Sequence, residues 1–193
     1  MVLAQINLTI ELREIILKNR PKELYMVSSK GTVPVLVTAN DTVIDESLDI
    51  MLWALKEDSK QNKLLNNLDK AMKIIEINDT IFKKWLDKYK YHDRYKENSK
   101  EFYRHKCTEI LNNYDKNLDK TKYIISDELN IVDIAIFPFI RQFANVDISW
   151  FSNTYKNLSN WLDIMCKSTL FNSVMKKYNI WEAGNQLIVN FND

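Results

Sequence analysis

Residues 30–36, Lys-Gly-Thr-Val-Pro-Val-Leu, and residues 45–50, Asp-Glu-Ser-Leu-Asp-Ile, decide the fold of this chain. The first stretch is apolar and β-branched after its glycine, which predicts a buried strand entered through the Val33–Pro34 bond. The second stretch places an acid and a hydroxyl just before an apolar helical pattern, which predicts a helix start. Together they predict a strand, a turn, a short partner strand and a helix, in that order.

This arrangement suits a small ligand that carries both an amide backbone and a carboxylate. We expect the bond before Pro34 to be cis, because a cis bond turns the chain sharply and presents the backbone of Val33 to a ligand. Ser47 and the backbone N–H groups at the helix start favour a carboxylate, and Glu46 suits an ammonium group. Each motif alone is more simply an ordinary turn or an ordinary N-cap, and it is their joint spacing that favours a ligand site.

The composition is that of a soluble protein with a hydrophobic core. The 193 residues are 46% hydrophobic and 27% charged, which fits one domain or two small ones. The 27 basic and 26 acidic side chains leave a net charge of +1, so no overall field favours nucleic acid or an anionic membrane. No apolar run reaches the roughly 18–20 residues of a membrane span, and the first residues lack the order of a signal peptide.

The side chains with reactive chemistry are not arranged as a catalytic or metal site. Cys107 and Cys166 lie far apart in the sequence, and we expect both to be buried, reduced thiols. This use of cysteine predicts a cytoplasmic protein. His92 and His105 have no partner at a spacing that suits a metal or a nucleophile. The sequence therefore predicts no metal site and names no catalytic residue.

The hydrophobic pattern divides the chain into a small mixed α/β domain and an all-helical domain. The first is predicted over residues 1–56 and the second over residues 64–181, with a charged linker between them. The elements expected in the first domain are strands over residues 8–17, 33–38 and 42–44, a helical turn over residues 22–27 and a helix over residues 46–55.

Apolar stripes at helical spacing continue through the second domain. We expect Asn78 and Asp79 to interrupt the pattern, with Asp79 as an N-cap. Asn130 and Asp133 are spaced as in a capping box, before an apolar helix that should lie at the centre of a bundle and that Pro138 should kink unless it falls near the first turn. The predicted helices cover residues 64–75, 79–89, 102–114, 130–140, 158–168 and 170–177, with a loop over residues 91–98 and a tail after residue 181.

A cluster of aromatic side chains follows the second of these helices. Its members are Trp85, Tyr89, Tyr91, Arg94 and Tyr95. Aromatic walls with a few polar tips suit an apolar co-substrate, so the cluster either lines an open pocket or serves ordinary helix packing.

The chain resembles the soluble glutathione S-transferase family, and within it a bacterial branch. The likeness runs from the start of the chain to about Trp181. Residues 30–36, 45–50 and 130–135 carry the likeness to the family. The likeness to the bacterial branch lies in residues 86–91, Leu-Asp-Lys-Tyr-Lys-Tyr, and in residues 137–147, Phe-Pro-Phe-Ile-Arg-Gln-Phe-Ala-Asn-Val-Asp.

The resemblance implies a thioredoxin-like N-terminal domain, an all-helical C-terminal domain and a homodimer. It implies that glutathione is the co-substrate, that Val33, beside Pro34, pairs with its cysteinyl part, and that Glu46 and Ser47 hold its γ-glutamyl end. Thr32 stands where members of the family often carry a side chain that touches glutathione. Asp133 would be a structural capping acid. Val132 and Asn130 depart from the usual alanine and Ser or Thr, and Asn caps a helix equally well.

The main departure from the family lies at the N-terminus. The family begins with a strand, a loop that carries a catalytic Tyr, Ser or Cys, and a helix, whereas residues 1–6 resemble only the end of that helix. The strand predicted at residues 8–17 would then lack a neighbour for its backbone groups, which is costly. We hypothesise that Met1 is an internal methionine of a longer protein; otherwise the chain is a remnant, or residues 1–6 pair in another way.

Three functions follow from the resemblance. The first is a transferase that adds the thiolate of glutathione to a small electrophile. The second is a glutathione-dependent thiol–disulfide oxidoreductase, which needs a reactive cysteine. The third is a non-catalytic glutathione-binding or interaction module.

Overall fold

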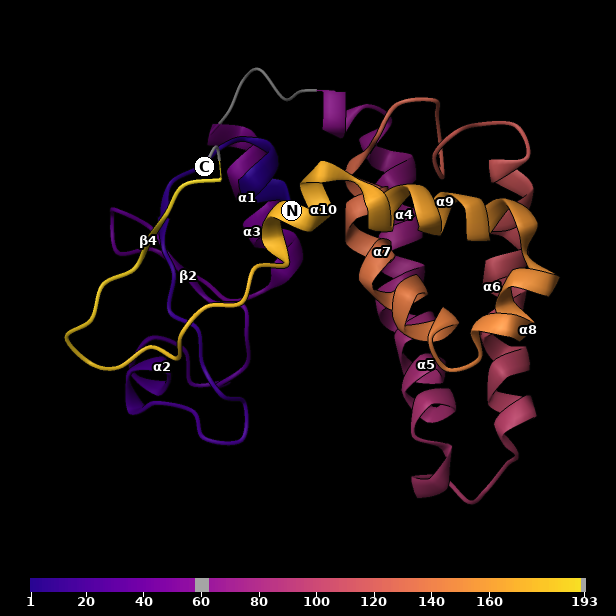
Figure 1. Cartoon of the computed structure of the whole chain (residues 1–193), viewed down its shortest axis with the longest axis horizontal. Helices are drawn as coiled ribbons and strands as arrows, with labels where there is room; N and C mark the ends of the chain where they lie inside the picture. The colour runs from indigo at the N-terminus through magenta and orange to yellow at the C-terminus, as the bar shows by residue number, and fades with distance from the viewer. Residues whose placement is uncertain (58–62, 192–193) are drawn as a thin grey trace. The chain divides into compact units, whose positions relative to one another are not determined.

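The computed structural model describes residues 1–57 and 63–191, which form two compact units. The first unit comprises Met1–Gln61 and Thr169–Asp193, and the second comprises Asn62–Ser168 (Figure 1). A small unit with short strands and an all-helical unit confirm the predicted fold class. The predicted linker lies mostly outside the described residues.

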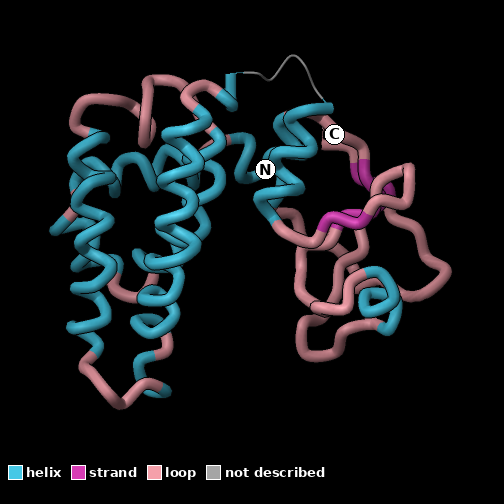
Figure 2. The backbone as a smooth tube through the Cα atoms, turned by 180° about the vertical axis from the view of Figure 1, so that it is seen from behind, coloured by secondary structure: helices cyan, strands magenta, loops and turns pink. Residues whose placement is uncertain are grey.

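The first unit combines short helices with two small sheets (Figure 2). In one sheet β1 (Ile10–Glu11) pairs antiparallel with β4 (Ile188–Val189), so that Ile10 lies opposite Val189. In the other, β2 (Leu36–Val37) pairs antiparallel with β3 (Val43–Ile44), so that Leu36 lies opposite Ile44. The helices of this unit are α1 (Val2–Gln5), α2 (Lys22–Val27), α3 (Ser47–Glu57) and α10 (Thr169–Val174).

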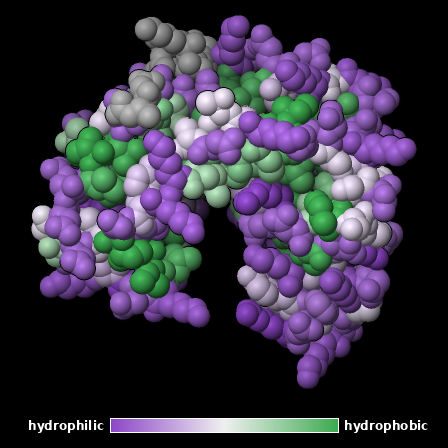
Figure 3. Space-filling model, viewed as in Figure 1, coloured by the Kyte–Doolittle hydropathy of each residue, from purple (hydrophilic) through white to green (hydrophobic). Residues whose placement is uncertain are grey.

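The core of the first unit lies where α1 meets α3 and α10. Val2 and Ala4 of α1 are buried there, as are Ile50 and Ala54, which are spaced i, i+4 and therefore share one face of α3. Apolar side chains also reach the surface of this unit, and the green areas over it in Figure 3 show them. Those exposed include Ile16, Leu17, Tyr25, Met26, Val27, Val33, Val37, Val43, Ile180 and Ile188.

Two strand predictions need correction. The strand expected over residues 8–17 covers only Ile10–Glu11, and the expectation that it lacks a neighbour is wrong because β4 supplies one. The strand expected over residues 33–38 covers only Leu36–Val37 and is not buried, since Val37 is exposed. Each described sheet has only two strands. In the β2–β3 pair, Val37 and Val43 lie opposite each other, and both are exposed.

The second unit is a helical bundle. Its α-helices are α4 (Leu68–Ile77), α5 (Lys83–Lys90), α6 (Lys100–Leu118), α7 (Ile131–Ala144), α8 (Ile148–Thr154) and α9 (Lys156–Lys167). As predicted, the apolar helix that follows Asn130 is the central one, because α7 contacts α4, α5 and α9. One face of α7 is not buried; it carries Ala135, Pro138, Phe139 and Gln142. Pro138 lies in the interior of α7 rather than in its first turn. The helix α8 was not predicted.

The predicted break at Asn78 and Asp79 is wrong. A π-helical turn, η2 (Asn78–Phe82), joins α4 to α5, and Asn78 keeps helical dihedral angles of φ −59° and ψ −46°. Asp79 therefore caps no helix; it pairs instead with Lys83 one turn later, at 3.4 Å. Phe82 is fully buried and packs on Phe143, which supplies a packing reason for the chain to stay helical here.

The capping box at the start of α7 is confirmed. The side chain of Asn130 accepts a hydrogen bond from the N–H of Val132 at 3.2 Å, and Asp133 accepts one from the N–H of Asn130 at 3.0 Å. Asp133 also accepts bonds from the N–H of Ile124 at 3.0 Å and the indole N–H of Trp161 at 2.9 Å. Its carboxyl thus ties together the connection before α7, the start of α7 and the helix α9.

Candidate functional site

The Val33–Pro34 peptide bond is cis, as the sequence predicts. Val33 is 45% exposed, and the hydrogen bonds among the described residues include none to its backbone N–H or C=O. Thr32 and Pro34 on either side are exposed as well. The backbone polar groups of Val33 are therefore not taken up by hydrogen bonds within the described part of the chain.

The second part of the predicted site is the start of α3. The C=O of Glu46 accepts the first hydrogen bond of this helix, from the N–H of Ile50 at 3.0 Å, and Ser47 is the first helical residue. Both side chains are exposed. The last pair of the β2–β3 hairpin is Leu36 opposite Ile44, so Pro34 precedes one end of the hairpin and Glu46 follows the other by two residues each.

A charged cluster that the sequence reasoning missed lies at this helix start. The ammonium of Lys30 donates to Asp45 Oδ1 at 3.0 Å and to Glu46 Oε1 at 2.7 Å. The buried Ser28 donates its hydroxyl to Asp45 Oδ2 at 2.9 Å. Hydrogen bonds from Lys30 and then from Ser28 hold the pKa of Asp45 below its usual value, and the bonds to Glu46 and Asp45 raise the pKa of Lys30.

No spacing of residues along the chain reveals this cluster. It could be predicted only from the register of the β2–β3 hairpin. Lys30 stands next to the glycine of the first motif, and Asp45 opens the second, some fifteen positions later. Only a correctly registered hairpin shows that the two approach each other. The hydroxyl of the buried Ser28 supports this cluster through its contact with Asp45.

Gly31 shapes the loop that carries Lys30 and Thr32. Its N–H donates to the C=O of Ser28 at 3.1 Å, which closes a turn, and its φ of +59° lies in the left-handed region that favours glycine. A Cβ atom at this position would collide with the ring of Tyr25. The glycine therefore satisfies both the backbone conformation and the close approach of α2.

Comparison with known protein families gives one match in each part of the chain. Residues 1–57 match the family described as glutathione S-transferase, N-terminal domain, and residues 77–168 match glutathione S-transferase, C-terminal domain. The chain belongs to the glutathione S-transferase family. The comparison with curated proteins returns no match.

Solved glutathione S-transferases share the fold. Glutathione transferase URE2P6 from Phanerochaete chrysosporium, in complex with oxidized glutathione, is 17% identical with a TM-score of 0.77, over 90% of this chain and 86% of that one. A class Gtt2 transferase of Vibrio parahaemolyticus is 21% identical with a TM-score of 0.67, over 89% and 88%. Glutathione S-transferase I, bound with lactoylglutathione, is 17% identical with a TM-score of 0.70, over 90% and 89%. At these identities the likeness shows the fold alone.

The two cysteines of this chain lie where burial disfavours the thiolate form. Cys107 is fully buried, as predicted, and burial raises the pKa of its thiol to about 12. Cys166 is only partly buried, contrary to the prediction, and burial again raises its pKa. A thiolate is the nucleophilic form of cysteine, so neither environment suits a nucleophile at neutral pH.

The histidines and the other potential ligands form no metal site in the described part of the chain. His92 lies 3.1 Å from its neighbour Asp93, and His105 is exposed and contacts Thr108. None of the described helices is long and apolar enough to cross a bilayer.

The predicted aromatic cluster divides into packing and surface parts. Tyr89 is buried, with its ring 5.0 Å from that of Phe143, so it serves helix packing rather than an open pocket. Arg94 lies 4.5 Å above the ring of Tyr91. Trp85 stacks on Tyr103 of α6 at 6.3 Å, and the rings of Trp85, Tyr95 and Tyr103 surround the ammonium of Lys88.

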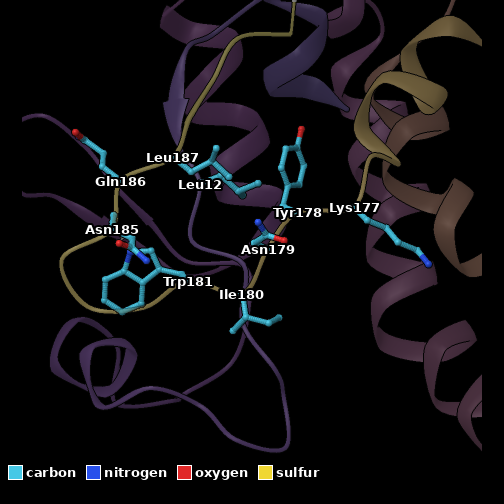
Figure 4. A pocket seen from close by; sticks show the side chains of 9 residues that line it. All are labelled: Leu12, Lys177, Tyr178, Asn179, Ile180, Trp181, Asn185, Gln186 and Leu187. Atoms are coloured by element: carbon cyan, nitrogen blue, oxygen red, sulfur yellow. The ribbon is translucent and has the colours of Figure 1, made fainter.

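A cavity of about 340 Å³ lies elsewhere in the first unit, between the C-terminal segment and the segment that follows β1 (Figure 4). Leu12 and Leu187 lie side by side there, joined by a backbone hydrogen bond of 2.9 Å. Trp181 donates its backbone N–H to Glu14 at 2.8 Å and its indole N–H to the C=O of Asn185 at 2.9 Å. The lining holds one charged side chain, Lys177, and none of the predicted site residues.

Proposed function

We propose that the first unit binds glutathione at the Val33–Pro34 bond and at the start of α3. In this proposal the backbone of Val33 pairs with the cysteinyl part of glutathione, as an added strand would. Glu46 binds the ammonium and Ser47 the carboxylate of the γ-glutamyl end, while Thr32 touches the same ligand. The observations that carry the proposal are the exposed Val33, whose backbone has no hydrogen-bond partner among the described residues, and the exposed Glu46 and Ser47 at the start of α3, in a chain of this family.

We propose further that the protein transfers glutathione to a small electrophile. The thiolate sulfur of glutathione attacks the electrophilic carbon, a C–S bond forms, and the leaving group departs with its electron pair. The chemistry needs a nearby donor that stabilises the thiolate, because the thiolate is the nucleophile. We assign that donor to no residue of this chain.

The thiol–disulfide oxidoreductase remains the second candidate. It requires a cysteine of lowered pKa, and the environments of Cys107 and Cys166 raise the pKa of both thiols. The raised pKa values of the two thiols therefore favour the transferase over the oxidoreductase, as far as the described residues are concerned. A non-catalytic glutathione-binding module uses the same site without the reaction.

Binding is tested by titration calorimetry of the full chain with glutathione. Ser47→Ala removes one hydrogen bond to a charged group, so we expect affinity to fall roughly tenfold or more. Ser29→Ala is the matched control, because Ser29 is an exposed serine of the same unit outside the proposed site, and it should leave the affinity unchanged. An absence of binding at millimolar glutathione contradicts the proposal.

Catalysis is tested with glutathione and chlorodinitrobenzene, which loses chloride as the thioether forms. A rate above the uncatalysed reaction that falls in Ser47→Ala supports the transferase. Binding without turnover identifies the non-catalytic module. Turnover with a small disulfide but not with the aryl chloride identifies the oxidoreductase.

The family resemblance also leads us to propose a cytoplasmic homodimer. Apolar side chains on the surface of the first unit, such as Met26 and Val37, are consistent with a further interface. Light scattering should give twice the 22.9 kDa mass of the chain, and a value of 22.9 kDa would rule the dimer out.

A further inference from the structure

Lys30 places an ammonium group of the chain itself on the two acids at the start of α3. Its Nζ atom lies 2.7 Å from Glu46 Oε1 and 3.0 Å from Asp45 Oδ1. Asp45 is held from its other side by the hydroxyl of Ser28 at 2.9 Å. The two carboxylates therefore already coordinate one cation.

The γ-glutamyl end of glutathione carries the same chemical group. A lysine side chain and an α-ammonium each offer three N–H donors and one positive charge. If Glu46 receives the ligand's ammonium, as the proposed function requires, two positive charges meet at one carboxylate and repel each other, so Lys30 and the ligand compete for Glu46. We propose that Lys30 occupies the ammonium subsite of the unliganded protein and that glutathione must displace it from Glu46. This inference rests on the proposed function.

The contacts allow this exchange at low cost. The side chains of Lys30 and Glu46 are 49% and 63% exposed, so their ion pair is screened by water. Asp45 is the less exposed acid, at 28%, and Ser28 fixes its position, so it retains Lys30 when Glu46 is taken by the ligand. Hydrogen bonds to Glu46 and then to Asp45 raise the pKa of Lys30 in this arrangement, so its side chain is a charged competitor.

Lys30 thereby sets how strongly the site selects for a free α-ammonium. An exposed ion pair of this kind shifts a binding equilibrium by about two- to fivefold. Ligands that carry the ammonium compete with Lys30, whereas ligands that lack it do not. The residue that competes is specific to this arrangement, since it depends on Lys30 and Asp45 meeting across the hairpin.

The test compares two ligands and two variants of the full chain by titration calorimetry. Glutaryl-cysteinyl-glycine retains the carboxylates and thiol of glutathione and lacks only its α-ammonium. Lys30→Met removes the competing charge and keeps an apolar stem. Lys22→Met removes an exposed lysine of the same unit that lies outside the cluster, and it controls for the general loss of positive charge.

We expect the ratio of glutathione affinity to glutaryl analogue affinity to rise about two- to fivefold in Lys30→Met and to stay constant in Lys22→Met. Both ligands carry the same carboxylates, so any attraction between Lys30 and those carboxylates affects both affinities equally and drops out of the ratio. An unchanged ratio overturns the inference and leaves glutathione binding intact. A lower ratio overturns it too, because Lys30 would then assist the ammonium-bearing ligand. If no variant binds either ligand, the proposed function fails together with the inference.

Discussion

Gly31 is held by two constraints, a φ of +59° and the ring of Tyr25 where its Cβ would stand. We therefore expect Gly31→Ala to lower the free energy of unfolding by about 2–4 kcal/mol, from left-handed strain and a steric clash together. Urea unfolding of the full chain measures the change.

Gly184 is the matched control for this substitution. Its φ is +95°, and nothing lies within 4 Å of a Cβ placed there. Gly184→Ala therefore carries the backbone strain alone, about 1–2 kcal/mol. In a Tyr25→Ala background the cost of Gly31→Ala should fall to that of the control. An equal cost of the two glycine substitutions in the wild-type background would show that Tyr25 does not constrain the loop.

Asp133 makes the stability of the helical unit depend on pH. Burial raises its pKa from an ordinary value of 3.8 to about 6, against the hydrogen bonds from Ile124, Trp161 and Asn130, which lower it. The native state therefore binds this proton more tightly than the unfolded chain does. The stabilisation is complete below about pH 4 and is lost as the pH rises to about 6, by up to about 3 kcal/mol.

Asp133→Asn supplies the reference for this effect, because it cannot titrate. We expect the unfolding free energy of the wild type to decline relative to that of Asp133→Asn as the pH is raised from about 4 to about 6 in urea unfolding experiments. A relative gain by the wild type over this range would mean that the three accepted hydrogen bonds outweigh burial and hold the pKa below 3.8.

At the scale of elements, β4 completes the first unit by pairing with β1. Val189 of β4 is 7% exposed and its neighbour Ile188 is 55% exposed, so the two residues face opposite sides of the strand. Val189→Thr buries a hydroxyl and should lower the unfolding free energy by about 1–3 kcal/mol. Chemical unfolding measures this change.

Ile188→Thr introduces the same residue on the exposed side of the same strand. Its effect should stay within about 0.5 kcal/mol, because a surface substitution away from a cap or a buried group changes little. Equal effects at the two positions would show that β4 does not pack against the rest of the first unit in solution.

The elements that the sequence predicts well are those specified by neighbouring residues. The capping box of Asn130 and Asp133, the cis bond before Pro34 and the start of α3 each depend on chemistry within a few residues. The β1–β4 pair depends on residues at opposite ends of the chain, with no turn between them to reveal the register. The π-helical turn at Asn78 was missed because a polar pair at a helix interior looks like a cap when packing is unknown.

The candidate site divides in the same way. Val33, Glu46 and Ser47 stand in the two motifs and were predicted from them. Lys30 was missed because its partners become visible only when the hairpin is folded in register.

In the whole molecule, residues of the first unit match the N-terminal domain of the family and residues of the second unit match its C-terminal domain. This pair of matches is what points to a function that uses glutathione. The fold is shared with solved transferases at 17–21% identity, which leaves the function to be carried by the residues of the site. In the proposed site those residues are the exposed Val33, Ser47 at the start of α3, and Asp45 and Glu46, which hold the ammonium of Lys30.

Glutathione binding at the proposed site is tested by an assigned amide NMR spectrum of the full chain, titrated with glutathione. We expect saturable shifts that are largest at the amides of Val33, Glu46 and Ser47. Shifts confined to another region, such as the cavity around Leu12 and Trp181, or no shifts at millimolar glutathione, would contradict it.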